Sequence, residues 1–426
     1  MAYRIAGIDV HKKMLAVVVA DVEVEGEYEF AGQRFGSHPE ELRRLSAWLS
    51  QQGVEEVVMA STAQYWQPVW GALERSGKPV CHRREGAGGM SGGLPLAQAQ
   101  SNRGRKGRKK DFPDAERLLK RLVAQELILS FVPEAEQRLW RAVTRRKYQL
   151  TRNRVQLPNR LESLLEEAHS KLSSLVSDLL GVSAPALAEG ETNPLALAAL
   201  ADQRLRASEA QLTDALGACT ELHPVYRRLL PMALPELPFL EQPRDQREQE
   251  IAALLRQHED AVQRLAEVPG LGVDSAQQII AEVGAAATTF ASAKNLASWV
   301  GACPGDEESA EVSKSHRSPK GSRHMRRLLN QAANAAVRTK GSIFQIVYRR
   351  LVPRLGHHHT IGAIAHRLGR LIWLILHRGV RYEERGPAVS QRSLRQRTRK
   401  MIRELQKLGY RVERLSVVAN APAPAQ

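Results

Sequence analysis

Three aspartates among the first 114 residues have the residue type and the setting of divalent-metal ligands. Asp9 lies in GIDVHKKMLAVVVA (residues 7–20), where apolar residues on both sides predict a buried strand. An ionised carboxylate in such a strand is costly unless a cation compensates its charge. Asp111 and Asp114 lie three residues apart in KKDFPDAERL, at the expected start of a helix, so both side chains can project to one side. Mg²⁺ prefers oxygen ligands of this kind, and two-metal phosphate chemistry needs several that converge from different elements.

Ser309 is a candidate nucleophile in the segment WVGACPGDEESAEVSKSHRSPKGSRHMRRLLNQAA. We expect an irregular acidic loop around it, then a basic and polar segment, and a helix that begins near Arg323. A serine that attacks a phosphodiester needs a group that takes its proton or stabilises the developing charge, and arginines or a metal supply this. The residues alone leave open an ordinary loop serine. Asp114 taken alone likewise fits a first-turn acid favoured by the helix dipole.

The charge balance indicates a polyanionic partner. Lys and Arg total 62 against 46 Asp and Glu, a formal net charge of +16 at pH 7. Because each neutralised phosphate releases counterions, this surplus favours nucleic acid, with a basic ribosomal or membrane-surface protein as the alternative. The basic residues that we assign to nucleic-acid binding are Arg103, Arg105, Lys106, Arg108, Lys109, Lys110, Lys320 and Arg323.

A Pro-Gly-Leu-Gly turn in EVPGLGVDSAQQIIAEVG is typical of a helix-hairpin-helix element. Gly270 and Gly272 would let backbone amides approach a phosphate, and Asp274 is expected to cap the helix that follows. The alternative is a tight turn between two helices with no ligand, because glycine is common in such turns.

The elements that position these residues form an α/β part and a helical part. Two apolar runs at residues 3–10 and 15–21 predict a β-hairpin. The elements expected next are a helix over 39–50, a buried strand over 55–61, a helix over 66–77, a strand over 78–83 and a glycine-rich segment over 85–93. We therefore expect an α/β domain whose first strands are antiparallel.

Long helical patterns follow from about residue 113. Pro158 is expected to kink or divide one helix, and a Pro-rich stretch at 231–243 is expected to interrupt a later region. Paired long helices favour a protruding coiled-coil or bundle arm, with a plain helical domain as the alternative. A second compact unit covers 266–380, and a basic helix lies beyond residue 386.

Cysteine spacing and hydropathy bear on the cellular compartment. Cys81, Cys219 and Cys303 lie far apart, which disfavours a zinc site or a disulfide scaffold. The most apolar late segment, residues 361–380, is interrupted by histidines and arginines and predicts a core helix rather than a membrane span. No secretion signal is visible, so we expect a cytoplasmic protein without a membrane partner.

Six motifs, in order, resemble the DEDD-type transposases of the insertion-sequence one-ten family. They are GIDVHKK, STAQYWQPVW, GRKKDFPDAERL, VPGLG, WVGACPGDEESA and SPKGSRHMRRLLNQAANAA. The resemblance extends over roughly residues 3–385 and implies α/β plus all-α architecture. The implied domains are an RNase H-like (RuvC-like) domain over 1–112, completed by the Asp111/Asp114 helix start, a coiled-coil arm over 113–265, a mainly helical transposase domain with the helix-hairpin-helix over 266–385, and a basic helix and tail over 386–426.

The resemblance also implies function. Asp9, Asp111 and Asp114 match the first and last two acids of a metal-binding tetrad, which implies Mg²⁺ or Mn²⁺ as cofactor. Ser309 matches the serine that forms a covalent link to DNA. The implied partners are double-stranded DNA of the element and target, a structured guide or bridge RNA, and further copies of the chain as a dimer or tetramer.

One departure from the family pattern affects the metal site. The family has Met-Glu-Ser-Thr where this chain has Met59-Ala60-Ser61-Thr62, so Ala60 occupies the position of the second acid. Glu56 cannot readily replace it, because four residues of extended strand span about 13 Å. The loss is expected to weaken Mg²⁺ binding and misplace what remains. Departures at Glu311 and at Ser322, where Asn or Asp is usual, are milder.

Three functions therefore remain in view from the sequence. The first is a transposase that cuts and rejoins DNA under RNA guidance. The second is a relative that retains RNA and DNA binding but has lost catalysis, for which Ala60 is the motive. The third is a RuvC-like junction nuclease that uses only the amino-terminal acids and forms no covalent intermediate.

Overall fold

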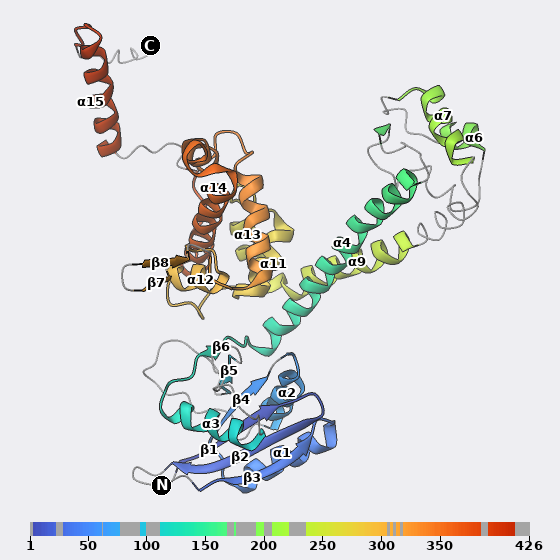
Figure 1. Ribbon diagram of the computed structural model, residues 1–426, viewed down its shortest axis with the longest axis vertical. Helices are drawn as coiled ribbons and strands as arrows, with labels where there is room; N and C mark the ends of the chain where they lie inside the picture. Colours follow the sequence, from blue (N-terminus) through green and yellow to red (C-terminus); the bar gives the residue numbers. More distant parts are fainter. Residues whose placement is uncertain are drawn as a thin grey trace, which may run out of the picture.

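The computed structural model shows a sheet-containing unit, a long helical arm and a second, mainly helical unit (Figure 1). The structure describes residues 3–22, 29–61, 63–76, 94–98, 111–167, 174–175, 193–199, 207–220, 236–304, 307–309, 312–315, 318–384 and 391–413. The strand expected over 78–83, the glycine-rich segment and the basic segment 103–110 lie outside the described residues.

A six-stranded mixed sheet forms the centre of the amino-terminal unit. Its strands are β1 (Tyr3–Val10), β2 (Met14–Val22), β3 (Ala31–Gly36), β4 (Glu56–Ser61), β5 (Leu96–Ala97) and β6 (Leu129–Ser130), in the order β3-β2-β1-β4-β5-β6. The expected hairpin is confirmed, since β1 and β2 pair antiparallel. β4 pairs parallel to β1, so the carboxyl ends of these two strands lie at the same edge of the sheet.

Helices cover both faces of this sheet. On one face, α1 (Pro39–Gln51) and α2 (Trp66–Ser76) pack through leucines, valines and Trp70 against the apolar side chains of β1, β2 and β4. On the other face, α3 (Asp111–Val123) packs through Ala115 and Leu119 against β1 and β2. The apolar side chains of β1 point alternately to the two faces of the sheet, and helices cover both faces. β1 is therefore a central, buried strand.

Two long antiparallel helices form the arm, which extends away from both units in Figure 1. These are α4 (Ala135–Glu167) and α9 (Glu236–Leu254), and the short helices α6 (Pro194–Ala199) and α7 (Glu209–Thr220) lie beyond their ends. The expectation that Pro158 divides its helix is wrong, because α4 runs through it. α9 similarly contains Pro243 and begins within the expected interruption. The packing of α4 against α9 stabilises each helix despite its proline.

The carboxy-terminal unit packs its helices around one large apolar core. Its elements are η2 (Arg256–His258), α10 (Glu259–Ala266), α11 (Val273–Val283), α12 (Ala293–Val300), the hairpin strands β7 (Glu307–Ser309) and β8 (Val312–Ser315), α13 (Arg323–Ala336) and α14 (Ile343–Arg378). α15 (Gln391–Lys407) stands apart from this core in Figure 1. Within the described part of the chain, no helix is long and apolar enough to cross a bilayer.

The packing favours unit boundaries that differ from the expected ones. α3 lies on the sheet and β6 pairs with β5, so the sheet unit extends to Ser130 rather than to residue 112. Ile251, Leu255 and the apolar residues of α10 belong to the core of the carboxy-terminal unit, which therefore begins before residue 266. Sequence periodicity marks helices but does not show which core a helix joins, and this explains both differences.

Candidate functional site

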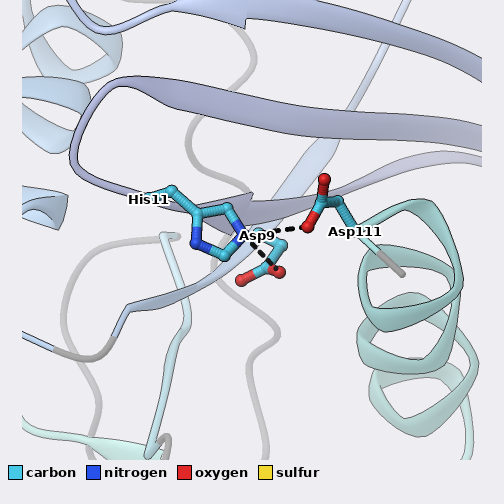
Figure 2. A group of neighbouring side chains, drawn as sticks. All are labelled: Asp9, His11 and Asp111. Atoms are coloured by element: carbon cyan, nitrogen blue, oxygen red, sulfur yellow. Dashed lines mark ion pairs between the residues drawn. The ribbon is translucent and has the colours of Figure 1, made fainter. Parts of the chain in front are cut away.

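Asp9, His11 and Asp111 converge at the edge of the sheet where β1 ends (Figure 2). The His11 Nε2 atom lies 3.1 Å from Asp9 Oδ2 and 3.3 Å from Asp111 Oδ1. One ligand atom from each residue lies within 4.8 Å of the others. The three side chains come from β1, from the turn that follows it and from the start of α3, and they point toward one another. A carboxylate–imidazole–carboxylate set of this size fits a divalent cation.

Close approach of α3 to β1 brings the acids together. Asp9 and Gly7 lie on the same face of β1, because side chains alternate along a strand. A Cβ added at Gly7 would lie 2.5 Å from the backbone oxygen of Ala115, one turn into α3. Gly7 therefore lets α3 lie directly on β1, and the first turn of the helix then places Asp111 beside Asp9.

We expect Gly7→Ala to destabilise the sheet unit by about 2 kcal/mol, the middle of the range for overpacking a close contact. Its methyl group would meet backbone, which cannot move aside without displacing α3. Urea denaturation measures the change. Gly362→Ala is the control, since its added Cβ meets nothing within 4 Å and the residue lies in α14. A Gly7→Ala protein as stable as the native chain would contradict the proposed packing role.

Burial and like charges act on the Asp9 carboxyl. Burial is the largest cause that raises the pKa of Asp9 above its ordinary value, and the carboxylates of Asp114 and Asp111 raise it further. His11 opposes this shift but does not cancel it. Only 18% of the Asp9 side chain is exposed, against 31% for Asp111. The site thus concentrates negative charge that a bound cation would stabilise.

Asp114 lies near this group but has a different partner. Its Oδ1 atom accepts a hydrogen bond from Arg117 Nη1 at 2.7 Å. Asp114 is not among the residues whose ligand atoms converge in the described part of the site. The two acids of this helix start therefore have different neighbours. Asp111 faces Asp9, whereas Asp114 accepts a hydrogen bond from Arg117, one turn later in α3. Asp111 has a cationic neighbour of its own, Arg34, whose Nη2 atom lies 3.7 Å from Asp111 Oδ2.

Strand register places Ala60, the position at which the family resemblance implies a second acid, next to Asp9. Ala60 is the register partner of Asp9 in the parallel pair of β4 and β1. Paired residues of neighbouring strands project to the same face, about 4.8 Å apart. Ala60 packs with Val58, Ala97 and Leu118, on the face that α3 covers. Ala60 therefore lies beside Asp9 in the sheet, and it presents a methyl group there.

Ser309 lies in the carboxy-terminal unit, at the end of a strand. The expected irregular loop is wrong for this residue, because the backbone of β7 pairs with β8 and Ser309 pairs with Val312. The residues before the hairpin, Val300 and Gly301, contact residues that follow it, Gly321 and Arg326. A Cβ added at Gly321 would lie 2.3 Å from Val300 O, and Arg326 Nη2 donates to Gly301 O at 2.9 Å. Figure 1 shows this hairpin and the sheet of the Asp9 site in different units of the chain.

Ser322 shows why one departure from the family pattern is mild. It is the N-cap of α13, and its side chain accepts a hydrogen bond from the backbone N–H of Met325. Asn, Asp and Ser serve almost equally well at this position of a helix. The helix start is therefore preserved.

The two glycines of the Pro-Gly-Leu-Gly turn differ in their surroundings. Gly270 has a φ of +86°, and a Cβ there would lie 2.3 Å from Ala332 O, so it is needed for close packing against α13. Gly272 is the N-cap of α11 and has open space around it. The expected cap role of Asp274 is wrong, because it lies in the first turn of α11 and bonds Lys147 Nζ at 2.7 Å.

A basic groove runs along one face of α13. It encloses about 820 Å³. Its lining residues include Lys320 and Arg323, for which we predicted nucleic-acid binding from the sequence. They also include Arg338, which was not among the predicted residues. Arg326 and Arg327 also line it, although both contact protein groups, the latter through Tyr148 at 3.6 Å from the ring centroid. The helical spacing of these arginines in the sequence was the signal that could have identified the whole face.

His11 is the functional candidate that sequence reasoning missed. No role was predicted for His11, although its two-residue separation from Asp9 is visible in the sequence. Two residues apart along a strand, side chains share a face, but a turn follows β1 here and its geometry cannot be read from spacing.

The mixed sheet with helices on both faces fits an RNase H-like domain, and comparison with known families agrees. Residues 6–170 match a DEDD transposase family of the IS110 type, and residues 262–349 match the Transposase IS116/IS110/IS902 family. The chain belongs to the IS110-family DEDD transposases. The expected α/β plus all-α fold class, with a RuvC-like domain and a helical carboxy-terminal region, is confirmed.

Solved structures and curated proteins add the following. A structure of Thermus thermophilus RuvC is similar at 16% sequence identity, covering 30% of this chain and 99% of that chain, with a TM-score of 0.21. A comparison with curated proteins gives no match.

Proposed function

We propose that this chain cuts and rejoins DNA strands for a bacterial insertion sequence, through a covalent Ser309–DNA link and with a divalent cation at the Asp9–Asp111 site. The observation that supports this most directly is the convergence of Asp9 and Asp111 from β1 and α3, in a member of the transposase family. A cation bound there would neutralise charge that develops on phosphate oxygens.

The proposed exchange conserves the number of phosphodiester bonds. The Ser309 oxygen attacks phosphorus and loses its proton to water, and one bond from phosphorus to a deoxyribose oxygen breaks. That oxygen takes up a proton and becomes a free hydroxyl group. Attack by a hydroxyl group of another strand then releases Ser309 and rejoins the DNA. Because the serine hairpin and the acid site lie in different units, the reaction requires a rearrangement of these units or a second copy of the chain.

Basic residues supply the proposed contacts to DNA and to a structured guide RNA. Lys320, Arg323 and Arg338 line the α13 groove, where their cationic side chains would contact phosphates. Gly272 is the second proposed phosphate contact. It is the N-cap of α11, and the space next to its Cα is open, so a phosphate could approach the N-terminal backbone amides of the helix. The segment 103–110 is proposed as a third contact on its charge alone. A homo-oligomer, dimer or tetramer, remains part of the proposal.

The covalent intermediate gives the test of this function. Labelled element-end DNA is incubated with the protein, the guide RNA and Mg²⁺ or Mn²⁺, and protein–DNA adducts are resolved under denaturing conditions. We expect adducts that Ser309→Ala abolishes and that Ser313→Ala, in the paired strand β8, leaves intact. The assay is run in the native chain and in Ala60→Glu, so that a weak metal site does not mask the serine chemistry.

The outcomes separate the alternatives. Binding of RNA and DNA without adducts in either background would identify a binding protein that has lost catalysis. Cleavage that persists in Ser309→Ala and yields hydrolysed ends would identify a junction nuclease instead.

A further inference from the structure

We infer that His11 is a third protein ligand of the metal and makes the site selective for first-row transition-metal dications over Mg²⁺. This inference rests on the proposed function, because it concerns the same cation. It concerns a residue outside the acid tetrad and follows from the side-chain positions in Figure 2.

The distances from the His11 nitrogen to the two carboxylates suit adjacent ligands of one cation. Ligand atoms that each lie about 2.1 Å from an octahedral cation are about 3 Å apart when they are adjacent. His11 Nε2 lies 3.1 Å from Asp9 Oδ2 and 3.3 Å from Asp111 Oδ1. The imidazole nitrogen is thus already at ligand spacing from both carboxylates, without a change of backbone.

The loss at position 60 gives the histidine its importance. Ala60 offers no ligand, and Asp114 bonds Arg117. Among the described residues, Asp9, His11 and Asp111 form the group that meets the spacing of a metal site. Three protein ligands leave further positions for water and for a DNA phosphate, as a catalytic site needs.

Replacing an oxygen ligand by an imidazole changes which cation binds best. Mg²⁺ is a hard cation that binds oxygen and retains its waters, whereas imidazole nitrogen suits the first-row transition metals. A set of two carboxylates and one imidazole therefore favours Mn²⁺, Co²⁺ or Zn²⁺ relative to an all-carboxylate tetrad. The chain would have exchanged a magnesium site for a mixed nitrogen–oxygen site.

A purely electrostatic role for His11 predicts the opposite result. If its imidazole only neutralised the two carboxylates in the absence of metal, a cation would have to displace it. Removal of the side chain would then strengthen metal binding. Because His11 is 46% exposed and follows the strand, its substitution is not expected to disturb the core.

The test uses the full-length protein with Mn²⁺ as the probe and needs no DNA. Pulsed electron paramagnetic resonance of the bound Mn²⁺ should show coupling to a ¹⁴N nucleus, and His11→Ala should remove it. Calorimetry should show Mn²⁺ bound at least about tenfold more tightly than Mg²⁺, with His11→Ala weakening Mn²⁺ binding by at least about tenfold. His359→Ala, at an exposed histidine of α14, is the matched control and should behave as the native chain.

The results discriminate sharply. Bound Mn²⁺ without ¹⁴N coupling, or tighter Mn²⁺ binding in His11→Ala, overturns the histidine ligand while leaving the proposed metal-dependent transposase intact. Failure of Mn²⁺ to bind the native chain also overturns it. The Ser309 adduct assay decides on the proposed function separately.

Discussion

Ala60→Glu should raise the affinity of the chain for Mg²⁺ by at least tenfold, which corresponds to about 1.4 kcal/mol. Ala60 is the register partner of Asp9, so a carboxylate at this position would project to the same face of the sheet. The added acid supplies the oxygen ligand that Mg²⁺ prefers and completes the set with Asp9 and Asp111. Isothermal calorimetry with Mg²⁺ measures the affinity, and the adduct assay measures whether strand exchange follows.

Ala60→Gln separates the charge of the new ligand from its size. The amide has the same shape as the glutamate, so a gain that it shares would reflect packing rather than coordination. Without metal, Ala60→Glu should be less stable than Ala60→Gln, because a third carboxylate faces two others and the pKa of Asp9 is already raised. Equal Mg²⁺ affinity in the two variants would show that residue 60 is not at the metal.

Glu282→Ala should reduce the free energy of unfolding by about 3 kcal/mol, the cost of leaving the largely buried Arg141 without its anion. Glu282 lies in α11 with 3% of its side chain exposed. Arg145 of α4 donates to both of its carboxylate oxygens, at 2.7 and 2.9 Å. Arg141 lies 3.5 Å from the same carboxylate, and burial lowers the pKa of Arg141 to about 10. The carboxylate therefore holds α4 of the arm against α11 of the carboxy-terminal unit.

Glu248→Ala is the matched control for this variant. Glu248 lies in the arm helix α9 and also pairs with a cation of α4, Lys147, at 3.5 Å, but 60% of its side chain is exposed, so its loss should cost less than about 1 kcal/mol. Urea unfolding compares the two variants, and limited proteolysis within α4 reports whether the arm has been released. Equal small losses in both would mean that the buried network does not hold the arm in place.

The sequence determined the local features of this protein. Apolar alternation predicted the hairpin of β1 and β2, and helical spacing predicted α1 and the start of α3 within a few residues. The motif order predicted the family, the RuvC-like domain and the position of the missing acid. These features depend on the order and spacing of residues that lie near one another in the chain, and both can be read directly from one sequence.

Tertiary structure decided which of those residues meet. Nothing local shows that Gly7 admits α3 against β1, that Asp111 and Asp114 take different partners, or that His11 faces both acids. Pro158 was expected to kink or divide its helix and the Pro-rich stretch 231–243 to interrupt a helical region, yet α4 contains Pro158 and α9 contains Pro243, because packing between the two helices outweighs the local cost. Contacts between segments that are far apart in the sequence depend on how helices and strands pack against one another. The periodicity of a segment shows which of its faces is apolar, but it does not show which other segment covers that face.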